Sequence, residues 1–356
     1  SAFYQGDIAR KITRYHAENN GWLTADDLAN FRVEIEPASR SNFCGLDIYT
    51  CGPWCQGPLL SQVLNILAAR KIEYIASDTS SYIHTVVEAM KLGFADRHAY
   101  YGDPRFIDVP LQTLLSPAYA RHRATRINPD KACPGMPAAG EIAGYDPGTK
   151  KSPPAAVDRY RPPERDTSFI CTVDKQGNCF AATPSDVNST APVIPGTGLI
   201  PSPRGSQSFE DPSHPACLAP GKRPRLTPNP AIVINPGQWA MPFGTPGNDV
   251  QVQAMVEVLL NIHLHKMSVQ RAINAPRFAT MSFPQTSTPH QYDKDLLLLE
   301  GRIPDAIGNR LTKLGHTVKK WRDFDWRAGA VCAIRRYEKT GRLEGGADPR
   351  RPSGVA

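Results

Sequence analysis

The 356-residue sequence contains no apolar run long enough to cross a bilayer, and its first residues, Ser1-Ala2-Phe3-Tyr4-Gln5, do not form a signal-peptide pattern. Its basic residues outnumber its acidic residues by 41 to 34, but they are scattered instead of forming a nucleic-acid-binding surface. Internal repeats are also absent. We therefore expect no membrane partner and no nucleic-acid partner, and the mild positive charge favours small anionic molecules.

Metal-binding patterns are missing as well. Cys51 and Cys55 have no second cysteine or histidine pair at zinc-finger spacing. His263 and His265 stand two residues apart in a predicted helix, so their side chains point to different sides. We expect no metal and no other cofactor.

The eight cysteines are irregularly spaced, and a chain of this length does not need a disulfide framework to fold. We therefore expect reduced, mostly buried thiols and a reducing compartment, which is the cytoplasm. A periplasmic location stays open, because Ser1 need not be the native N-terminus.

What the sequence does contain is a series of periodic segments, in a chain long enough for one large domain or two ordinary ones. Apolar residues at helical spacing predict helices over residues 4–19, 59–69, 80–100, 250–265, 268–274 and 304–314, and Thr24 is expected to cap a further short helix. Alternating segments predict strands within residues 31–51, a hairpin of residues 231–234 and 239–243, and strands near 330–336. In the helix 80–100 we expect His84, Asp96 and Arg97 to serve as caps or structural ion pairs.

The central feature is the segment from Asp166 to Ser185. Alternation in residues 168–173 and 179–183, with Gly177 and Asn178 between them, predicts a β-hairpin. Residues 127–166 are rich in proline and glycine and have no apolar period, so we expect a mobile linker there. Thr167 either begins an ordinary strand or is a nucleophile that cleavage of the linker exposes, and the hairpin alone favours the ordinary strand.

This hairpin resembles the start of the small chain of the gamma-glutamyltranspeptidases, which belong to the N-terminal-nucleophile hydrolases. Further short motifs match that family in the same order along nearly the whole chain. Two lie upstream of the hairpin, Gly93-Phe94-Ala95-Asp96-Arg97 and Tyr101-Gly102-Asp103-Pro104, and six lie downstream, Pro195-Gly196-Thr197-Gly198, Pro220-Gly221-Lys222-Arg223-Pro224, Gly244-Thr245-Pro246-Gly247, Ala275-Pro276-Arg277, Gly315-His316 and Asp348-Pro349-Arg350. Each motif is short, but their common order is a specific signal.

The resemblance implies a mixed α/β fold, the four-layer αββα sandwich of the N-terminal-nucleophile hydrolases. Residues 1–166 would be the C-terminal part of the large chain, mainly helical and ending in the linker, and residues 167–356 would be the small chain with the nucleophile and the core sheet. The first part of the family's large chain is missing from this sequence. Self-cleavage would give a heterodimer of large and small chains, and whether this forms homo-oligomers stays open.

The catalytic residues implied by the resemblance depend on cleavage of the bond between Asp166 and Thr167. Thr167 would then carry a hydroxyl and a free α-amine, and an α-amine with a pKa of about 7.7–8.0 can serve as general base for its own hydroxyl. Ser185 stands where the family has a second threonine near the nucleophile. Gly247 and Asn248 stand where the family has two glycines that supply oxyanion N–H groups, with a plain structural turn as the alternative.

The resemblance also implies contacts to the substrate. Thr227 occupies the place of one of two serines that hold the substrate carboxylate in the family, and Leu226 occupies the place of the other. Asn188 is a less certain match to a nearby polar contact.

An important departure from the family lies in the loop 201–209. True transpeptidases have an acidic residue there, which pairs with the ammonium of the gamma-glutamyl group. This sequence offers Arg204, Ser206 and Gln207 instead, and a basic or neutral site would not favour an ammonium. Because arginine binds carboxylates in a bidentate manner, we expect a small amide substrate whose acyl group carries a carboxylate but no free α-amine.

The sequence thus predicts a self-processing amidohydrolase or acyltransferase, more similar to the oxamate amidohydrolases and cephalosporin-type acylases of the family than to its transpeptidases. A true gamma-glutamyltransferase or glutathione hydrolase is one alternative. A non-catalytic fragment or scaffold of the same fold is the other.

Overall fold

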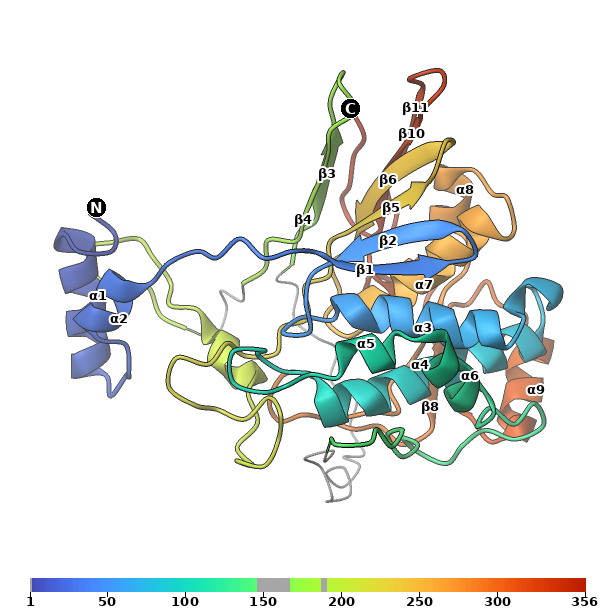
Figure 1. The fold of residues 1–356 in the computed structure, drawn as a ribbon, viewed down its shortest axis with the longest axis horizontal. Helices are drawn as coiled ribbons and strands as arrows, with labels where there is room; N and C mark the ends of the chain where they lie inside the picture. The colour runs from blue at the N-terminus through green and yellow to red at the C-terminus, as the bar shows by residue number, and fades with distance from the viewer. Residues whose placement is uncertain (1, 146–166, 187–190) are drawn as a thin grey trace. The chain divides into compact units, whose positions relative to one another are not determined.

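The computed structural model describes residues 2–145, 167–186 and 191–356, which divide into two compact units (Figure 1). The first unit comprises Ser1–Pro37 and Asp186–Gly205, and the second comprises Ala38–Ser185 and Ser206–Ala356. No helix within the described ranges has both the length and the hydrophobicity that a membrane-spanning helix requires.

The first unit contains the helices α1 (Asp7–Glu18) and α2 (Ala25–Asn30). Thr24 caps α2, because its Oγ1 accepts the N–H of Asp27 at 3.2 Å and its own N–H donates to the Asp27 carboxylate at 2.8 Å. A small core holds the helices together and consists of Ala9, Ile12, Leu28 and Ile194. The predicted N-terminal helices and the Thr24 cap are therefore confirmed.

The strands predicted within residues 31–51 form only in the second part of that range, as β1 (Ser39–Phe43) and β2 (Leu46–Thr50). An alternating segment becomes a strand when another strand pairs with it and one of its faces is buried. Val33 is 80% exposed and Ile35 is 101% exposed, and no described strand pairs with residues 31–38. The sequence prediction is wrong for those residues.

A six-stranded antiparallel sheet forms the centre of the second unit, with the strand order β1-β2-β5-β6-β10-β11. Its other strands are β5 (Ala231–Asn235), β6 (Trp239–Gly244), β10 (Cys332–Tyr337) and β11 (Leu343–Gly346). β5 and β6 form the predicted second hairpin, in which Val233 lies opposite Met241. β10 pairs with the other edge of β6, so that Cys332 lies opposite Gly244.

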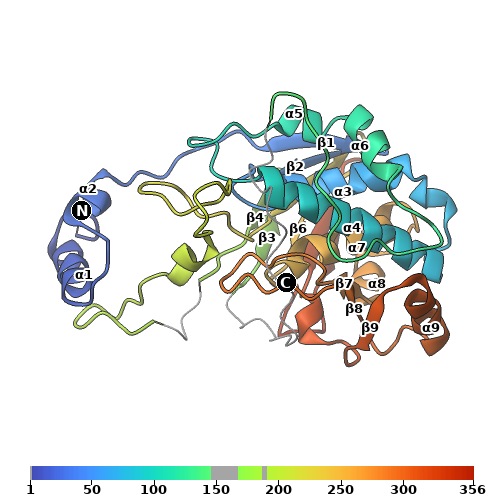
Figure 2. The same ribbon diagram turned by 90° about the horizontal axis from the view of Figure 1, so that it is seen from below.

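One face of this sheet is covered by helices. Successive side chains of a strand point to opposite faces, and Val233, Met241 and Phe243 join the main hydrophobic core. The helices on this face are α3 (Gly57–Ala69), α7 (Val250–His263) and α8 (Val269–Asn274). Figure 2 shows that α4 (Ser80–Tyr100) lies beside α3, and it is buried along almost its whole length. The shorter helical elements nearby are η1 (Ile72–Tyr74), α5 (Leu111–Leu114) and α6 (Pro117–Ala124).

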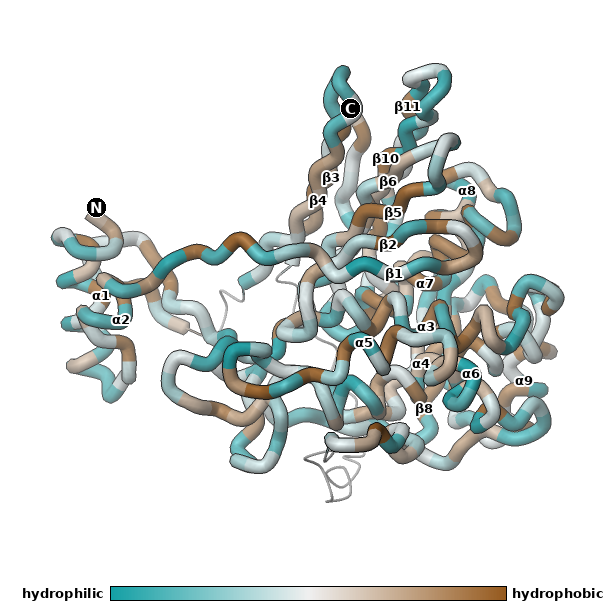
Figure 3. Tube along the Cα trace, viewed as in Figure 1, coloured by the Kyte–Doolittle hydropathy of each residue, from teal (hydrophilic) through white to brown (hydrophobic). Residues whose placement is uncertain are grey.

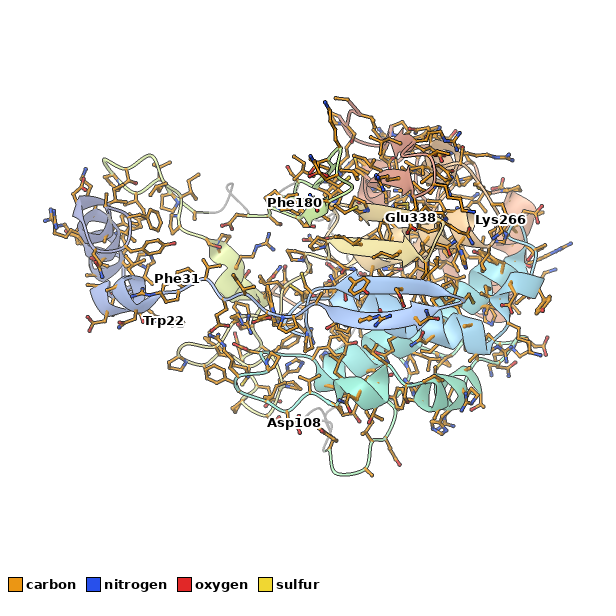
Figure 4. All side chains as sticks on the ribbon, turned by 45° about the horizontal axis from the view of Figure 1, so that its top comes forward. Trp22, Phe31, Asp108, Phe180, Lys266 and Glu338 are labelled. Atoms are coloured by element: carbon orange, nitrogen blue, oxygen red, sulfur yellow. The ribbon has the colours of Figure 1, made fainter. Side chains whose placement is uncertain are left out.

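The predicted first hairpin packs on the opposite face of the sheet, as β3 (Ile170–Val173) and β4 (Cys179–Ala182). It contacts β5, β6 and β10. Its outer face exposes Ile170 at 52% and Phe180 at 55%, and Phe180 is labelled in Figure 4. Figure 3 shows hydrophobic residues along both β5 and this hairpin, so that the described residues build a helix layer, a sheet and a second strand layer.

A three-stranded sheet lies beside α4 and is joined by the helix α9 (Asp305–Leu314) (Figure 2). Its strands are β7 (Phe278–Thr280), β8 (Leu296–Leu299) and β9 (Thr317–Lys320), with β7 antiparallel and β9 parallel to β8. The described residues also contain two short helical turns, η2 (Pro203–Gln207) and η3 (Trp326–Ala328).

Candidate active site

Thr167 and Ser185 lie side by side at the open end of the β3–β4 hairpin. Their backbones form an antiparallel bridge, and the N–H of Ser168 donates to the carbonyl of Pro184 at 2.9 Å. The two hydroxyl oxygens, Thr167 Oγ1 and Ser185 Oγ, are 2.6 Å apart, and Thr167 is only 8% exposed. The structure therefore brings together the two hydroxyl residues that the sequence singled out. Asp166 and Asn188 lie outside the described residues.

The end of β6 lies against Phe169, which follows Thr167 by two residues. A Cβ built on Gly244 would lie 2.4 Å from Cε2 of the Phe169 ring, a distance at which one of the two groups must shift. Glycine is therefore required where the strand that carries Thr167 crosses β6. The turn at Gly247 and Asn248 follows only three residues later.

The turn itself has a left-handed backbone at two successive residues. Gly247 has a φ of +131° and Asn248 has a φ of +49°, a region that only glycine and, less readily, asparagine enter without much strain. The carbonyls of Gly247 and Asn248 accept the N–H groups of Val250 and Gln251 at 2.9 and 3.2 Å, which opens α7. Within the described chain, no acceptor takes the N–H group of Gly247 or of Asn248. The turn thus offers two unused donors at a helix N-terminus.

Thr227 is joined to this turn through a side chain that the sequence analysis missed. Nε2 of Gln56 donates to the carbonyl of Thr227 at 3.1 Å and to the carbonyl of Asn248 at 3.4 Å. Thr227 is fully buried, and in the described part of the chain its Oγ1 has no hydrogen-bond partner. The neighbouring Leu226 donates its N–H to the carbonyl of Trp54 at 2.8 Å.

The residues of the loop 201–209 are distributed over both units. Arg204 belongs to the first unit, where its Nε lies 4.0 Å from Oδ1 of Asp186. Ser206 and Gln207 belong to the second unit. Nε2 of Gln207 donates to Ser287 Oγ at 3.2 Å, and the carbonyl of Ser206 accepts the N–H of Thr288 at 2.9 Å. These contacts tie both residues to the segment between β7 and β8.

Among the described residues, one group of side chains has the geometry of a metal site. The ligand atoms of His84, Glu88 and His316 all lie within 4.8 Å of one another. However, Nδ1 of His84 is hydrogen-bonded to Nε2 of His316 at 2.9 Å, its Nε2 to the carbonyl of Asn128 at 2.7 Å, and Glu88 accepts from Lys91 at 2.9 Å. Burial, His84 and Lys91 lower the pKa of His316 to about 3, so this imidazole stays neutral. The ligand atoms of this group are therefore already used in hydrogen bonds within the protein, which is typical of structural residues.

A further buried polar residue, Arg97, donates hydrogen bonds to Gln56, Asp249 and Thr286. The motif Gly93-Phe94-Ala95-Asp96-Arg97 pointed to Arg97, and Asp249 directly follows Asn248. No local pattern around either residue indicates that the two side chains meet.

Comparison with known proteins identifies relatives of the whole chain. A protein-family model described as gamma-glutamyltranspeptidase matches residues 1–356. The glutathione hydrolase-like YwrD proenzyme of Bacillus subtilis is 31% identical over 352 residues, which are 98% of this chain and 61% of the relative. The oxamate amidohydrolase proenzyme of Klebsiella pneumoniae is 30% identical over 354 residues, 98% of this chain and 60% of the relative.

The crystal structure of a cephalosporin acylase from Bacillus halodurans superposes on 100% of this chain with a TM-score of 0.83 and 28% identity, and 59% of that structure is matched. This match confirms the predicted mixed α/β fold. The chain spans 59% to 61% of the length of these three relatives.

Proposed function

This chain belongs to the gamma-glutamyltranspeptidase family, and we propose that the protein containing it is a self-processing amidohydrolase or acyltransferase with Thr167 as its nucleophile. The observation that carries the proposal is the contact of 2.6 Å between the hydroxyls of Thr167 and Ser185 in a hairpin whose Phe169 packs against the last residue of β6. In the turn that follows β6, two N–H groups have no acceptor among the described residues. Together these residues supply the three groups that acyl transfer needs, namely a nucleophile, a polar partner for it and oxyanion donors.

In the proposed mechanism, cleavage of the bond between Asp166 and Thr167 releases the α-amine of Thr167. The Thr167 Oγ1 attacks the amide carbonyl carbon of the substrate, and the α-amine takes the hydroxyl proton at the same time. The carbon–nitrogen bond then breaks, the proton passes to the departing amine, and an ester on Thr167 remains. Water completes the reaction as hydrolysis, or a second amine completes it as acyl transfer. Ser185 donates to, or accepts from, the reacting oxygen and so orients it.

The negative charge that develops on the carbonyl oxygen would be bound by the N–H groups of Gly247 and Asn248. Each such donor is worth about 3 kcal/mol in an oxyanion hole, because it is already oriented before the charge forms. The dipole of α7 points its positive end at the same place. Self-cleavage uses the same hydroxyl on the preceding peptide carbonyl, and it would leave a large chain and a small chain that stay associated.

For the substrate, we propose a small amide whose acyl group carries a carboxylate and no free α-amine. Ser206 and Gln207 are neutral, and the segment 201–209 contains the cation Arg204 but no acidic residue. The name of the oxamate amidohydrolase relative describes an amide of this kind, whereas the glutathione hydrolase-like relative supports the alternative of a gamma-glutamyl donor.

A pair of chromogenic substrates separates these two possibilities. Glutaryl anilide and gamma-glutamyl anilide differ only in the α-amine, and an unpaired ammonium in a partly buried pocket costs about 1–3 kcal/mol. We expect the glutaryl compound to react with a roughly tenfold to hundredfold higher kcat/KM. Faster turnover of the gamma-glutamyl compound would assign the protein to the glutathione hydrolases. If the full-length protein neither cleaves itself nor releases aniline or ammonia from any amide in a panel that includes oxamate, it is a non-catalytic member of the fold.

A further inference from the structure

The guanidinium of Arg97 lies at the centre of a buried polar network in the second unit. Its Nη1 donates to the carboxylate of Asp249, to Oε1 of Gln56 at 3.1 Å and to Oγ1 of Thr286 at 3.1 Å. The guanidinium carbon also lies 4.6 Å from the ring centre of Phe94, and the arginine side chain is 1% exposed. One side chain of α4 therefore contacts groups from three other segments of the chain.

The Asp249 carboxylate is held from both sides. Oδ1 accepts the hydroxyl of Thr286 and Oδ2 accepts the N–H of the same residue, both at 2.7 Å. Burial would raise the pKa of the Asp249 carboxyl, but the charge of Arg97 and the hydrogen bonds from Arg97 and Thr286 hold it below its usual value. Asp249 is thus ionised, and its position relative to α4 is fixed.

Gln56 connects Arg97 to the turn at Gly247 and Asn248. Its Oε1 accepts from Arg97, and its Nε2 donates to the carbonyl of Asn248 and to that of Thr227. The turn is therefore fixed at two points: the Asn248 carbonyl is held by Gln56, and the next residue, Asp249, is held by Arg97. The direction of the N–H groups of Gly247 and Asn248 follows from these two points.

We propose that Arg97 and Asp249 are positioning residues that preorganise the turn at Gly247 and Asn248 for oxyanion binding. The two residues pair directly, Thr286 bonds to both of them, and Gln56 joins Arg97 to the Asn248 carbonyl. The inference rests on the proposed function. An oxyanion hole is effective only when its donors need no rearrangement as the charge forms. A left-handed backbone at two successive residues does not hold its direction alone, and the ion pair behind it supplies the constraint.

A second buried ion pair on α4 provides a matched control. Asp96 precedes Arg97 in the chain, and its carboxylate lies 3.1 Å from Nη2 of Arg123, with side chains that are 0% and 3% exposed. Arg123 also donates to the carbonyls of Leu92 and Ala138, and none of these groups contacts the turn. Replacement of either arginine by lysine should destabilise the fold to a similar degree, because lysine cannot replace a guanidinium that bonds several acceptors at once.

The test compares Arg97→Lys, Asp249→Asn and Arg123→Lys in the full-length protein. Amide hydrogen exchange is followed at Val250 and Gln251, whose N–H groups close the turn onto Gly247 and Asn248. We expect exchange to be roughly tenfold faster in the first two variants and unchanged in Arg123→Lys. In the same preparations kcat for an anilide should fall roughly tenfold to hundredfold in the first two variants, with KM within about twofold, because an oxyanion donor acts only in the transition state.

If Arg97→Lys or Asp249→Asn does not fold, Thr286→Val and Thr286→Ser provide a second test of the same network. Valine removes the hydroxyl that donates to Asp249, so exchange should accelerate, while serine retains that hydroxyl and should preserve the slow exchange. Unchanged exchange in Arg97→Lys and Thr286→Val, or equal acceleration in Arg123→Lys, would overturn the proposal. A wild-type protein without amidase activity would refute the proposed function, and the exchange data would still decide whether this network positions the turn.

Discussion

The hairpin that carries Thr167 packs on β6 through Phe169, and the turn at Gly247–Asn248 follows β6, but the two are held in different ways. Thr167 is held by a backbone bridge and a hydroxyl contact to Ser185, in a hairpin whose outer face exposes Ile170 and Phe180. The turn is held from behind by the buried side chains of Gln56 and Arg97.

This difference matches the tasks that we propose for the two sides. The nucleophile must first be released from a peptide bond and must then attack, so its strand needs freedom to shift. The oxyanion donors must stay in place throughout, because their energetic value depends on not being reoriented. We therefore expect substitutions in the Thr167 hairpin and substitutions around the Gly247–Asn248 turn to have different effects on cleavage and turnover.

The largest effect is expected on the nucleophile side, from Thr167→Ala. Without the hydroxyl, the chain should stay uncut and amide turnover should fall roughly a thousandfold or more. Intact-mass spectrometry and release of aniline measure the two effects. Thr167→Ser, which keeps a hydroxyl, should still be cut and active, and an alanine variant that is cut normally would remove Thr167 from the mechanism.

A smaller effect is expected from Ser185→Ala. The Ser185 hydroxyl touches the nucleophile but does not react, so we expect kcat to fall roughly a hundredfold and KM to stay within about twofold. Steady-state kinetics on one anilide separates the two parameters. A change confined to KM would mean that Ser185 binds the substrate and does not orient Thr167.

The sequence predicts the hairpin of Thr167 better than the support of the turn, because the hairpin depends on residues that are close together in the sequence. Residues 80–100 and both hairpins were predicted almost to the residue, because helical spacing, alternation and turn residues are local signals. The pairing of Thr167 with Ser185 also follows from a hairpin register. The short helices α5 and α6 were not foreseen, since neither has enough turns to show an apolar period.

The support of the turn could not be predicted in the same way. Arg97 and Asp249 are 152 residues apart, and nothing in the local pattern around either residue indicates the other. The sequence correctly suggested that Arg97 forms an ion pair, but its partner required the fold. The same limit applied to residues 31–38, where alternation was present and a partner strand was not.

Gly244 lies against Phe169 of the nucleophile hairpin and precedes the turn by three residues, so Gly244→Ala should disturb both sides. The new Cβ would lie 2.4 Å from the Phe169 ring, so we expect a loss of about 1–3 kcal/mol in the free energy of unfolding. Denaturant unfolding measures this loss. Gly308→Ala in α9 is the control, because its Cβ would meet no atom closer than 3.7 Å and alanine favours a helix. Equal stability of both variants would show that Phe169 does not pack on β6 as described.

The smallest effect is expected at Asn248, where only the backbone N–H is proposed to act. Asn248→Gly keeps that N–H and suits the φ of +49°, so kcat should change less than about threefold. Lys71, which is remote from Asn248 in the sequence, has a similar φ of +53° and serves as the control. Lysine tolerates this backbone less well than asparagine, so Lys71→Gly should stabilise the fold by about 1 kcal/mol. If Asn248→Gly instead lowers kcat more than about tenfold while its unfolding free energy is unchanged, the Asn248 side chain takes part in the reaction, and the oxyanion site is more than a turn of two N–H groups.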